Sequence, residues 1–249
     1  MTSPEEQRRT LTGPGGEAVL TYVRDTRDGR PWADLAEPLV PDPVPAVLDA
    51  FSGWAFSGPV DLGERLLRHG ARPLRHAHTM SLDLTAAAPL PAAWRDAALP
   101  GGLRRTACDR PAAELLPAYR AAFSAEHPDH EPVTDRHLLD HRLLPLLDGT
   151  ALGPVLPCSA LAVDGAGRPA AGIIVADRDG LPWVASVFRD PDPRYAGAGA
   201  ALMRHALTEA AAGGATEVGL AVTEANPARA LYEKLGFVVL RTSLTVLVP

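Results

Sequence analysis

Residues 194–203 read RYAGAGAALM and lie between a predicted strand and a predicted helix. Gly197 and Gly199 allow the backbone to approach an anion closely and to adopt positive φ. The free amides at the start of a helix, with the partial positive charge there, form an anion site, and Arg194 adds a cation at its rim. The stretch therefore predicts a phosphate-binding loop. Close packing of the helix on a sheet is an alternative reason for the two glycines.

Two common phosphate loops do not fit this stretch. A Walker loop requires Lys-Ser or Lys-Thr after its glycines, and neither follows Gly199. The dinucleotide fingerprint would open the first strand–helix–strand unit of the chain and be followed by an acidic ribose ligand. The loop at 194–199 is therefore expected to bind phosphate in another way.

A second stretch, TEANPARALYEKLGF at 223–237, follows after one strand. Asn226 is a good N-cap for a helix with Pro227 at its first position, where the missing N–H does no harm. Gly236 ends this short helix, and Tyr232 lies on its face. Tyr232 could donate a proton in catalysis, or it could belong to the buried stripe of an amphipathic helix.

Together, RYAGAG at 194–199 and NPARALYEKLGF at 226–237 resemble the GCN5-related N-acetyltransferase (GNAT) family. The order of elements and the separation of about 30 residues are part of the resemblance, which is sharpest from Val187 to Phe237 and extends over 102–249. It implies an α/β fold with a mixed sheet, acetyl-CoA (coenzyme A) as cofactor, and transfer of an acyl group to an amine.

The resemblance also implies roles for individual residues. Residues at the end of one strand would offer backbone groups to the pantetheine arm and the thioester, and the glycine loop would hold the pyrophosphate. The implied cofactor-binding residues are Ser186, Val187, Phe188, Arg189, Arg194, Tyr195, Ala196, Gly197, Ala198, Gly199, Ala200, Asn226 and Arg229. Tyr232 would protonate the departing thiolate, since a phenol with a pKa of about 10 stays protonated at neutral pH.

The group that deprotonates the acceptor amine is harder to find. Strand 182–188 contains no carboxylate, and GLAV at 219–222 is apolar. Glu224, just after that strand, is one candidate. Polar residues between the first two helices of 102–249, near the family's acceptor site, could bind or deprotonate an amine or form a solvated loop. These are Glu126 and His127, with Asp129, His130 and Glu131.

The rest of the pattern predicts a mixed sheet with helices on its faces. Predicted strands cover 103–108, 159–164, 170–177, 182–188, 217–222 and 237–248, and predicted helices cover 111–124, 134–149, 199–212 and 227–235. We divide the chain into a flexible N-terminus (1–16), an N-terminal domain (17–88), a linker rich in Ala and Pro (89–101) and a catalytic domain (102–249).

The N-terminal domain contains a partial repeat. The first 18 residues of 66–84 align without a gap on 232–249, with Gly70 opposite Gly236 and Leu66 opposite Tyr232. The alignment predicts a partial or degenerate GNAT-like domain that has lost the acid and the cofactor loop. An unrelated capping domain is the alternative, and in both cases its role would be structural or would shape the acceptor pocket.

Composition excludes several other classes of protein. The net charge of −6 argues against a nucleic-acid partner, and no apolar run approaches the ~20 residues that cross a bilayer. The chain opens without a signal peptide, and its two cysteines form neither a disulfide framework nor a CxxC motif, so we expect a cytoplasmic protein. His137 and His141 are spaced like metal ligands, but no HExxH motif accompanies them, and we predict no metal.

The sequence thus predicts an N-acetyltransferase in which the primary amine of a small molecule attacks acetyl-CoA directly in a ternary complex. A non-catalytic acyl-CoA sensor and a protein N-acetyltransferase are the alternatives. We expect a monomer or a homodimer. The sequence does not name the acceptor.

Overall fold

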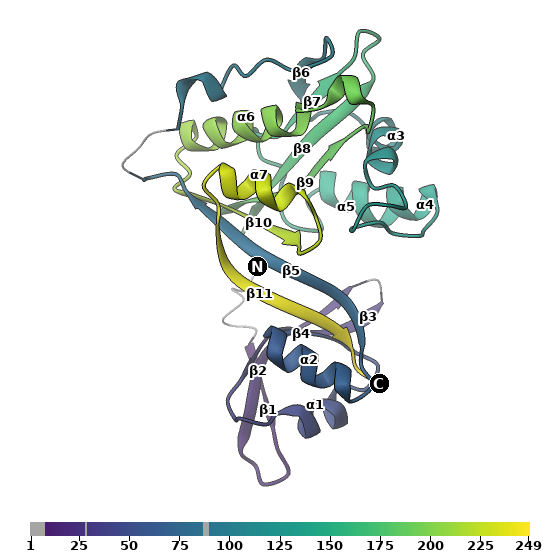
Figure 1. Ribbon diagram of the computed structural model, residues 1–249, viewed down its shortest axis with the longest axis vertical. Helices are drawn as coiled ribbons and strands as arrows, with labels where there is room; N and C mark the ends of the chain where they lie inside the picture. The colour runs from purple at the N-terminus through teal and green to yellow at the C-terminus, as the bar shows by residue number, and fades with distance from the viewer. Residues whose placement is uncertain (1–7, 28, 87–89) are drawn as a thin grey trace. The chain divides into compact units, whose positions relative to one another are not determined.

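The computed structural model describes residues 8–27, 29–86 and 90–249 (Figure 1). The chain forms two compact units, of which the first comprises Met1–His78 with Leu240–Pro249 and the second comprises Thr79–Val239. Two strands pass between them: β5 (Arg72–Asp83) starts in the first unit and ends in the second, and β11 (Val238–Leu247) does the reverse. Among the described residues, no helix has the length and apolar character needed to cross a membrane.

The second unit has the predicted mixed α/β architecture. Its strands lie in the order β5-β10-β9-β8-β7-β6, in which the pairs β6–β7, β7–β8 and β8–β9 are antiparallel and β10 is parallel to β9. Its elements after β5 are η1 (Ala92–Trp94), β6 (Arg104–Ala107), α3 (Ala112–Ala122), α4 (Asp135–Leu138), a π-helical turn (Leu139–Leu143), α5 (Leu144–Leu147), β7 (Ala160–Val163), β8 (Pro169–Arg178), β9 (Leu181–Arg189), η3 (Pro193–Tyr195), α6 (Ala198–Ala212), β10 (Glu217–Thr223) and α7 (Ala228–Lys234). The predicted elements of residues 102–249 are therefore confirmed to within a few residues at their ends.

Helices cover both faces of this sheet. On one face α6 crosses β7, β8 and β9 (Figure 1), and its buried side chains include Leu202 and Met203. On the other face α3 packs on β8 and β9 around Leu115 and Phe188. Because β8 contributes to the cores on both faces, seven consecutive residues within it, 170–176, are buried. A run of this kind is typical of a central strand rather than of an alternating one.

The first unit is a smaller sheet with two helices. Its strands lie in the order β1-β2-β3-β4-β11-β5, and α1 contacts α2 over a core that includes Leu20, Phe56 and Val246. The elements before β5 are β1 (Arg8–Thr12), β2 (Ala18–Arg27), β3 (Arg30–Pro38), α1 (Val44–Ala50), β4 (Ala55–Gly58) and α2 (Val60–Arg68). The last strand of the chain therefore completes a sheet that the first residues begin.

The two segments that the sequence aligns have the same structure. Helices α2 and α7 are each followed by a glycine with positive φ, Gly70 at 92° and Gly236 at 99°, and then by a long strand. The strand before each helix pairs in parallel, at two positions, with the preceding strand of the chain. Strand β4, before α2, pairs with β3, and strand β10, before α7, pairs with β9. The first unit thus repeats the strand–helix–strand–helix–strand order of the second, as the predicted repeat requires.

Two features of the predicted domain organisation differ from the structure. Residues 1–7 of the predicted flexible N-terminus lie outside the described residues, but residues 8–12 form β1, because their backbone groups pair with β2. The described part of the predicted linker packs against α6: Arg95 pairs with Glu209 at 3.0 Å, and its carbonyl lies 3.2 Å from His205 Nδ1. Residues 90–101 therefore belong to the second unit, and residues 240–249 to the first.

Candidate functional site

A bulge interrupts β9 near its middle. Consecutive residues of β8, Ile174 and Val175, pair with residues 186 and 184, so Ala185 is an extra residue opposite them. Such an insertion bends the strand and increases its twist. Beyond the bulge, Val187 packs toward the α6 side of the sheet and Phe188 is buried on the α3 side.

Strands β9 and β10 are hydrogen-bonded to each other just before this bulge. They pair in parallel at Trp183↔Gly219 and Val184↔Leu220, and both strands continue beyond these pairs. The recorded parallel pairing therefore ends before the carboxyl ends of the two strands. Ligands of open α/β sheets bind in crevices at the carboxyl ends of such strands.

The glycine loop lies at this end of β9. Gly197 has φ 92° and precedes α6, in which Ala201 N–H is the first amide to bond within the helix, to the Gly197 carbonyl at 3.0 Å. The amides of the first helical residues, 198–200, have no acceptor within the helix because of their position. A Cβ built on Gly197 meets no atom within 4 Å, and one built on Gly199 would lie 3.5 Å from Val187 Cγ1. The loop thus offers amides beside open space, as an anion site requires.

Polar contacts hold the preceding turn in place. Asp192 accepts hydrogen bonds from the Arg194 backbone N–H at 3.0 Å and from Arg194 Nε at 2.7 Å. Arg189 Nη1 donates to the carbonyls of Asp190 and Asp192 at 2.6 and 3.1 Å. The hydrogen bond to Asp192 raises the pKa of Arg194. The guanidinium of Arg194 also lies 5.0 Å from the centre of the Tyr195 ring. Arg194 is an exposed cation in the turn before the glycine loop, and Arg189 binds the carbonyls of the same turn.

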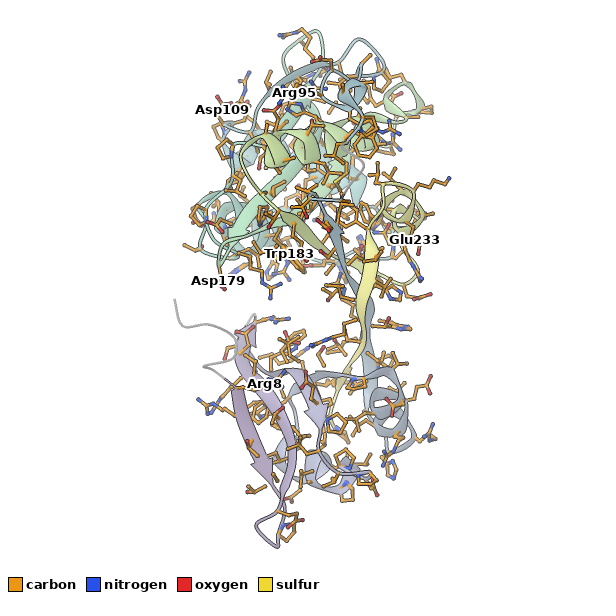
Figure 2. All side chains as sticks on the ribbon, turned by 90° about the vertical axis from the view of Figure 1, so that its left-hand side faces the viewer. Arg8, Arg95, Asp109, Asp179, Trp183 and Glu233 are labelled. Atoms are coloured by element: carbon orange, nitrogen blue, oxygen red, sulfur yellow. The ribbon has the colours of Figure 1, made fainter. Side chains whose placement is uncertain are left out.

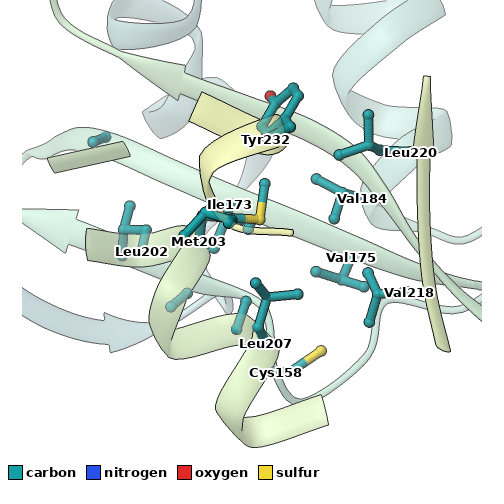
Figure 3. Packing of buried hydrophobic residues seen from close by; sticks show 14 of the residues in the cluster. Cys158, Ile173, Val175, Val184, Leu202, Met203, Leu207, Val218, Leu220 and Tyr232 are labelled. Atoms are coloured by element: carbon teal, nitrogen blue, oxygen red, sulfur yellow. The ribbon is translucent and has the colours of Figure 1, made fainter. Parts of the chain in front are cut away.

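Tyr232 lies on α7 with its ring in the core of the second unit. Its side chain is 9% exposed, and its ring centre lies 5.9 Å from that of Phe237. Figure 3 shows Tyr232 at the edge of the cluster, with its hydroxyl directed away from Met203 and Ile173. Burial, and to a smaller extent the charge of Asp129, raises the pKa of Tyr232 to about 12. Tyr232 is thus both a buried-stripe residue and a phenol that stays protonated.

A polar network joins the start of α7 to the loop between α3 and α4. Asn226 Oδ1 accepts the Ala228 N–H at 2.9 Å, which is the capping interaction expected of Asn226 although regular helix begins only at Ala228. Asn226 Nδ2 donates to Asp129 Oδ2 at 2.8 Å, and the Thr223 hydroxyl donates to Asp129 Oδ1. The sequence placed Asp129 in a polar loop but did not predict these contacts, which span more than 90 residues of chain.

Tyr119 on α3 is a second phenol near this network. Its ring lies 5.6 Å from that of Phe188, and burial raises its pKa, with further raising contributions from the charges of Glu131 and Asp129. The charge of Arg142 acts in the opposite direction. Tyr119 lies within the predicted helix 111–124, and no neighbouring residue along the chain marks it as part of a polar site.

Two other predicted residues, Glu224 and Arg229, are bound to each other. Arg229 Nη1 lies 3.0 Å from Glu224, and Arg229 Nε lies 2.9 Å from Glu233, which projects from α7 (Figure 2). Glu224 is thus a partner of a guanidinium at the start of α7, which disfavours it as a base. Arg229 remains within one helical turn of Asn226.

The remaining candidates lie on the loop between α3 and α4. Glu126 is exposed and accepts a hydrogen bond from Ser124 at 2.8 Å, which lowers its pKa. His127 Nδ1 accepts the Asp129 N–H at 3.0 Å, so that His127 helps to shape the turn that presents Asp129. The structure therefore brings Asp129, rather than Glu126, to the start of α7.

The first unit keeps the bulge but not the loop. In β3 an extra residue stands opposite β2 around Leu35, which has φ 51°. Arg8 Nη1 donates to the Leu35 carbonyl at 3.2 Å, and Arg8 Nη2 donates to Glu37 at 2.8 Å. The next helix, α1, follows Pro43 and spans seven residues, without the glycines that expose amides at α6. The described residues of this half therefore include no counterpart of the glycine loop before α6, as the degenerate repeat predicts.

The chain matches the model of the acetyltransferase (GNAT) family over residues 113–237. These residues run from α3 to the end of the α7 turn and include the bulge, the glycine loop, Asn226 and Tyr232. No curated protein matches the chain in sequence.

Several solved structures share its fold. A GCN5-related N-acetyltransferase from Sphaerobacter thermophilus superposes with a TM-score of 0.62 at 19% identity, covering 96% of this chain and 79% of the other. One from Kribbella flavida has a TM-score of 0.56 at 21% identity, covering 98% and 91%. A tandem GNAT protein from the clavulanic acid biosynthesis pathway has a TM-score of 0.57 at 15% identity, covering 94% and 80%. With its family match over half of its length, the chain belongs to the GNAT family of acetyltransferases.

Proposed function

We propose that this protein transfers an acetyl group from acetyl-CoA to the primary amine of a small molecule. The observation that carries the proposal is the convergence of three features at the carboxyl ends of β9 and β10. These are the bulge at Ala185, the open amides at Gly197–Ala200, and Tyr232 on the helix that follows β10. Membership of the acetyltransferase family supports acyl transfer in general.

The residues of the glycine loop fit a pyrophosphate. The amides of residues 197–200 would bind its oxygens, since successive N–H groups after a residue with positive φ, here Gly197, can form a concave anion site. Arg194 at the rim would add a charge-assisted contact. The pantetheine arm would then lie along β9 past Val187, with the acyl carbonyl near the bulge, where a strand exposes backbone groups that are not used in pairing. Asn226 and Arg229, at the start of α7, would lie on the β10 side of the arm.

The protein's own contribution to the reaction would be to position the reactants and to supply a proton. Holding the amine against the thioester converts a bimolecular step into an effectively unimolecular one. When the amine attacks the acyl carbon, the C–N bond forms and the C–S bond breaks. Tyr232 would give its proton to the leaving sulfur, and the proton that the new amide nitrogen loses restores the phenol. The pKa of about 12 keeps Tyr232 protonated at neutral pH.

The experiment is a comparison of two tyrosine variants. Release of CoA is measured with acetyl-CoA and a panel of small amines for the wild type, Tyr232→Phe and Tyr22→Phe. We expect Tyr232→Phe to lower kcat about 100-fold with little change in the Kd of acetyl-CoA, because only a general acid is lost. Tyr22, in the first unit, serves as the matched control and should leave both values unchanged.

The alternatives give different results in the same assay. A non-catalytic acyl-CoA sensor would bind acetyl-CoA but release no CoA with any amine in the panel. A protein N-acetyltransferase would be inactive on small amines and active on peptides with free N-termini or lysines. Wild-type protein that neither binds acetyl-CoA nor turns over would refute the proposal altogether.

A further inference from the structure

The loop between α3 and α4 brings one carboxylate, that of Asp129, to the carboxyl end of β10. Its two oxygens accept hydrogen bonds from Thr223, the last residue of β10, and from Asn226, at the start of α7. The partners of Asp129 lie 94 and 97 residues further along the chain. The carboxylate is thus fixed, at both oxygens, to the two elements that lead to Tyr232.

The donors to Asp129 are a hydroxyl and an amide, both of which are neutral. The neighbouring carboxylate in the same loop has a charged donor. Both oxygens of Glu131 accept hydrogen bonds from Arg142 Nε, Oε1 at 2.8 Å and Oε2 at 3.0 Å. Glu224, at the other side of the start of α7, is bound to Arg229. Neutral donors orient a carboxylate without cancelling its charge, and each oxygen keeps a further lone pair for another donor.

The charge of Asp129 acts on both phenols of the site. It contributes to the raised pKa of Tyr232 after burial, and to the raised pKa of Tyr119 after burial and the larger effect of the charge of Glu131. Tyr232 is on α7 and Tyr119 is on α3, so Asp129 lies within electrostatic reach of residues from both sides of β9.

We propose that Asp129 binds the ammonium group of the acceptor and accepts the proton that it must lose before attack. This inference rests on the proposed acetyltransferase function. The ammonium N–H bond breaks and its proton moves to a carboxylate oxygen and then to solvent, which leaves the lone pair on nitrogen to form the C–N bond. Tyr232 separately protonates the sulfur. The acceptors are therefore amines that are cations in solution, and Thr223 and Asn226 are positioning residues for Asp129.

The variant Asp129→Asn removes the charge and keeps the hydrogen bonds. The Thr223 hydroxyl can accept as well as donate, so an asparagine can donate to Thr223 while its oxygen accepts from Asn226. The loop therefore stays attached to β10 and α7. The matched control is Asp135→Asn, which removes an exposed carboxylate that is bound to Arg120 at 2.8 Å and begins α4.

The experiment compares isosteric acceptors that differ in charge. Each pair consists of an alkylamine and the alkoxyamine in which oxygen replaces the carbon next to nitrogen. The first pair is 2-phenylethylamine and O-benzylhydroxylamine. At neutral pH the amine is a cation and the alkoxyamine is neutral. We expect Asp129→Asn to lower kcat/KM at least about 100-fold for the cation and less than about threefold for the neutral isostere, since only the cation loses a charge partner. Asp129→Glu should restore part of the activity with the cation, and KM for acetyl-CoA should not change.

Equal losses for both members of a pair would overturn the inference, since a purely structural role of Asp129 would affect them alike. If the wild type is active in that experiment, the proposed acetyltransferase function still holds. A wild type that is inactive with every pair of acceptors would overturn both the role of Asp129 and the proposed acetyltransferase function. A fall in Tm of Asp129→Asn together with equal losses would identify Asp129 as a structural link only.

Discussion

Gly101 lies directly against the backbone of Arg194. A Cβ built on Gly101 would come within 2.7 Å of the Arg194 carbonyl oxygen and 3.0 Å of Tyr195 Cδ1. Gly101 also has φ 63°, which side chains other than glycine rarely adopt. The turn before β6 therefore packs against the glycine loop, and the segment expected to be a linker adjoins the proposed cofactor site.

Replacing Gly101 by alanine should displace this loop. The neighbouring Gly102 has φ 71° with no atom within 4 Å of its Cβ position, so Gly102→Ala imposes backbone strain without a clash. We expect Gly102→Ala to cost about 1 kcal/mol and Gly101→Ala about 1–3 kcal/mol more in denaturant titrations. Only Gly101→Ala should also weaken acetyl-CoA binding. Equal costs for the two variants would show that the contact with Arg194 carries no energy.

Gly199 gives a complementary prediction, in which binding changes and stability does not. A Cβ there makes an ordinary contact with Val187, but the branches of valine would extend into the space beside the open amides. Gly199→Val should therefore raise the Kd of acetyl-CoA at least about tenfold while Tm stays within about 2 °C. Ala212→Val, at the exposed end of α6, is the control for introducing valine into this helix. Unchanged affinity in Gly199→Val would remove the loop from the proposed cofactor site.

Features that short stretches of sequence determine could be predicted. The glycine loop, the capped helix with Tyr232 and the elements of residues 102–249 depend on turn residues, caps and local periodicity. The repeat could be predicted because Gly70 and Gly236 occupy matching positions in the sequence. Both glycines end equivalent helices, where the backbone has positive φ.

Features that depend on distant contacts could not be predicted. The hydrogen bonds of Asp129 join residues 94 and 97 positions apart, and no local pattern marks their partners. The position of β11 is similar: residues 240–247 read as a strand, but a strand's period does not tell which sheet it joins. β1 was missed because its five residues are largely polar and follow a polar start.

The strand β11 provides a test of the two-unit fold. Leu244 is 7% exposed and lies so close to α2 that a Cβ on Gly63 would be 2.8 Å from it, whereas Leu240 is 63% exposed. Leu244→Ala should destabilise the first unit by about 2–4 kcal/mol, and Leu240→Ala by less than about 0.5 kcal/mol. Limited proteolysis should show earlier cleavage within residues 8–78 in Leu244→Ala alone. Earlier cleavage in the second unit instead would contradict the assignment of β11 to the first.

Tyr232 should make the protein sensitive to alkaline pH. Its pKa is about 12 in the folded protein and about 10 when unfolded, so folding favours the protonated phenol. This contribution to stability is fully present below pH 10 and is lost as the pH rises toward 12. By pH 11 the loss is about 1.4 kcal/mol, an order-of-magnitude value.

The measurement is the free energy of unfolding of wild type and Tyr232→Phe at pH 9 and pH 11. Other groups that titrate in this range, including Cys108, Cys158 and Tyr119, are present in both proteins, so their effects cancel in the difference. We expect wild type to lose about 1.4 kcal/mol more than the variant between the two pH values. Parallel losses would mean that the phenol reaches solvent when ionised, and a phenol exposed in that way would not stay protonated by burial during turnover.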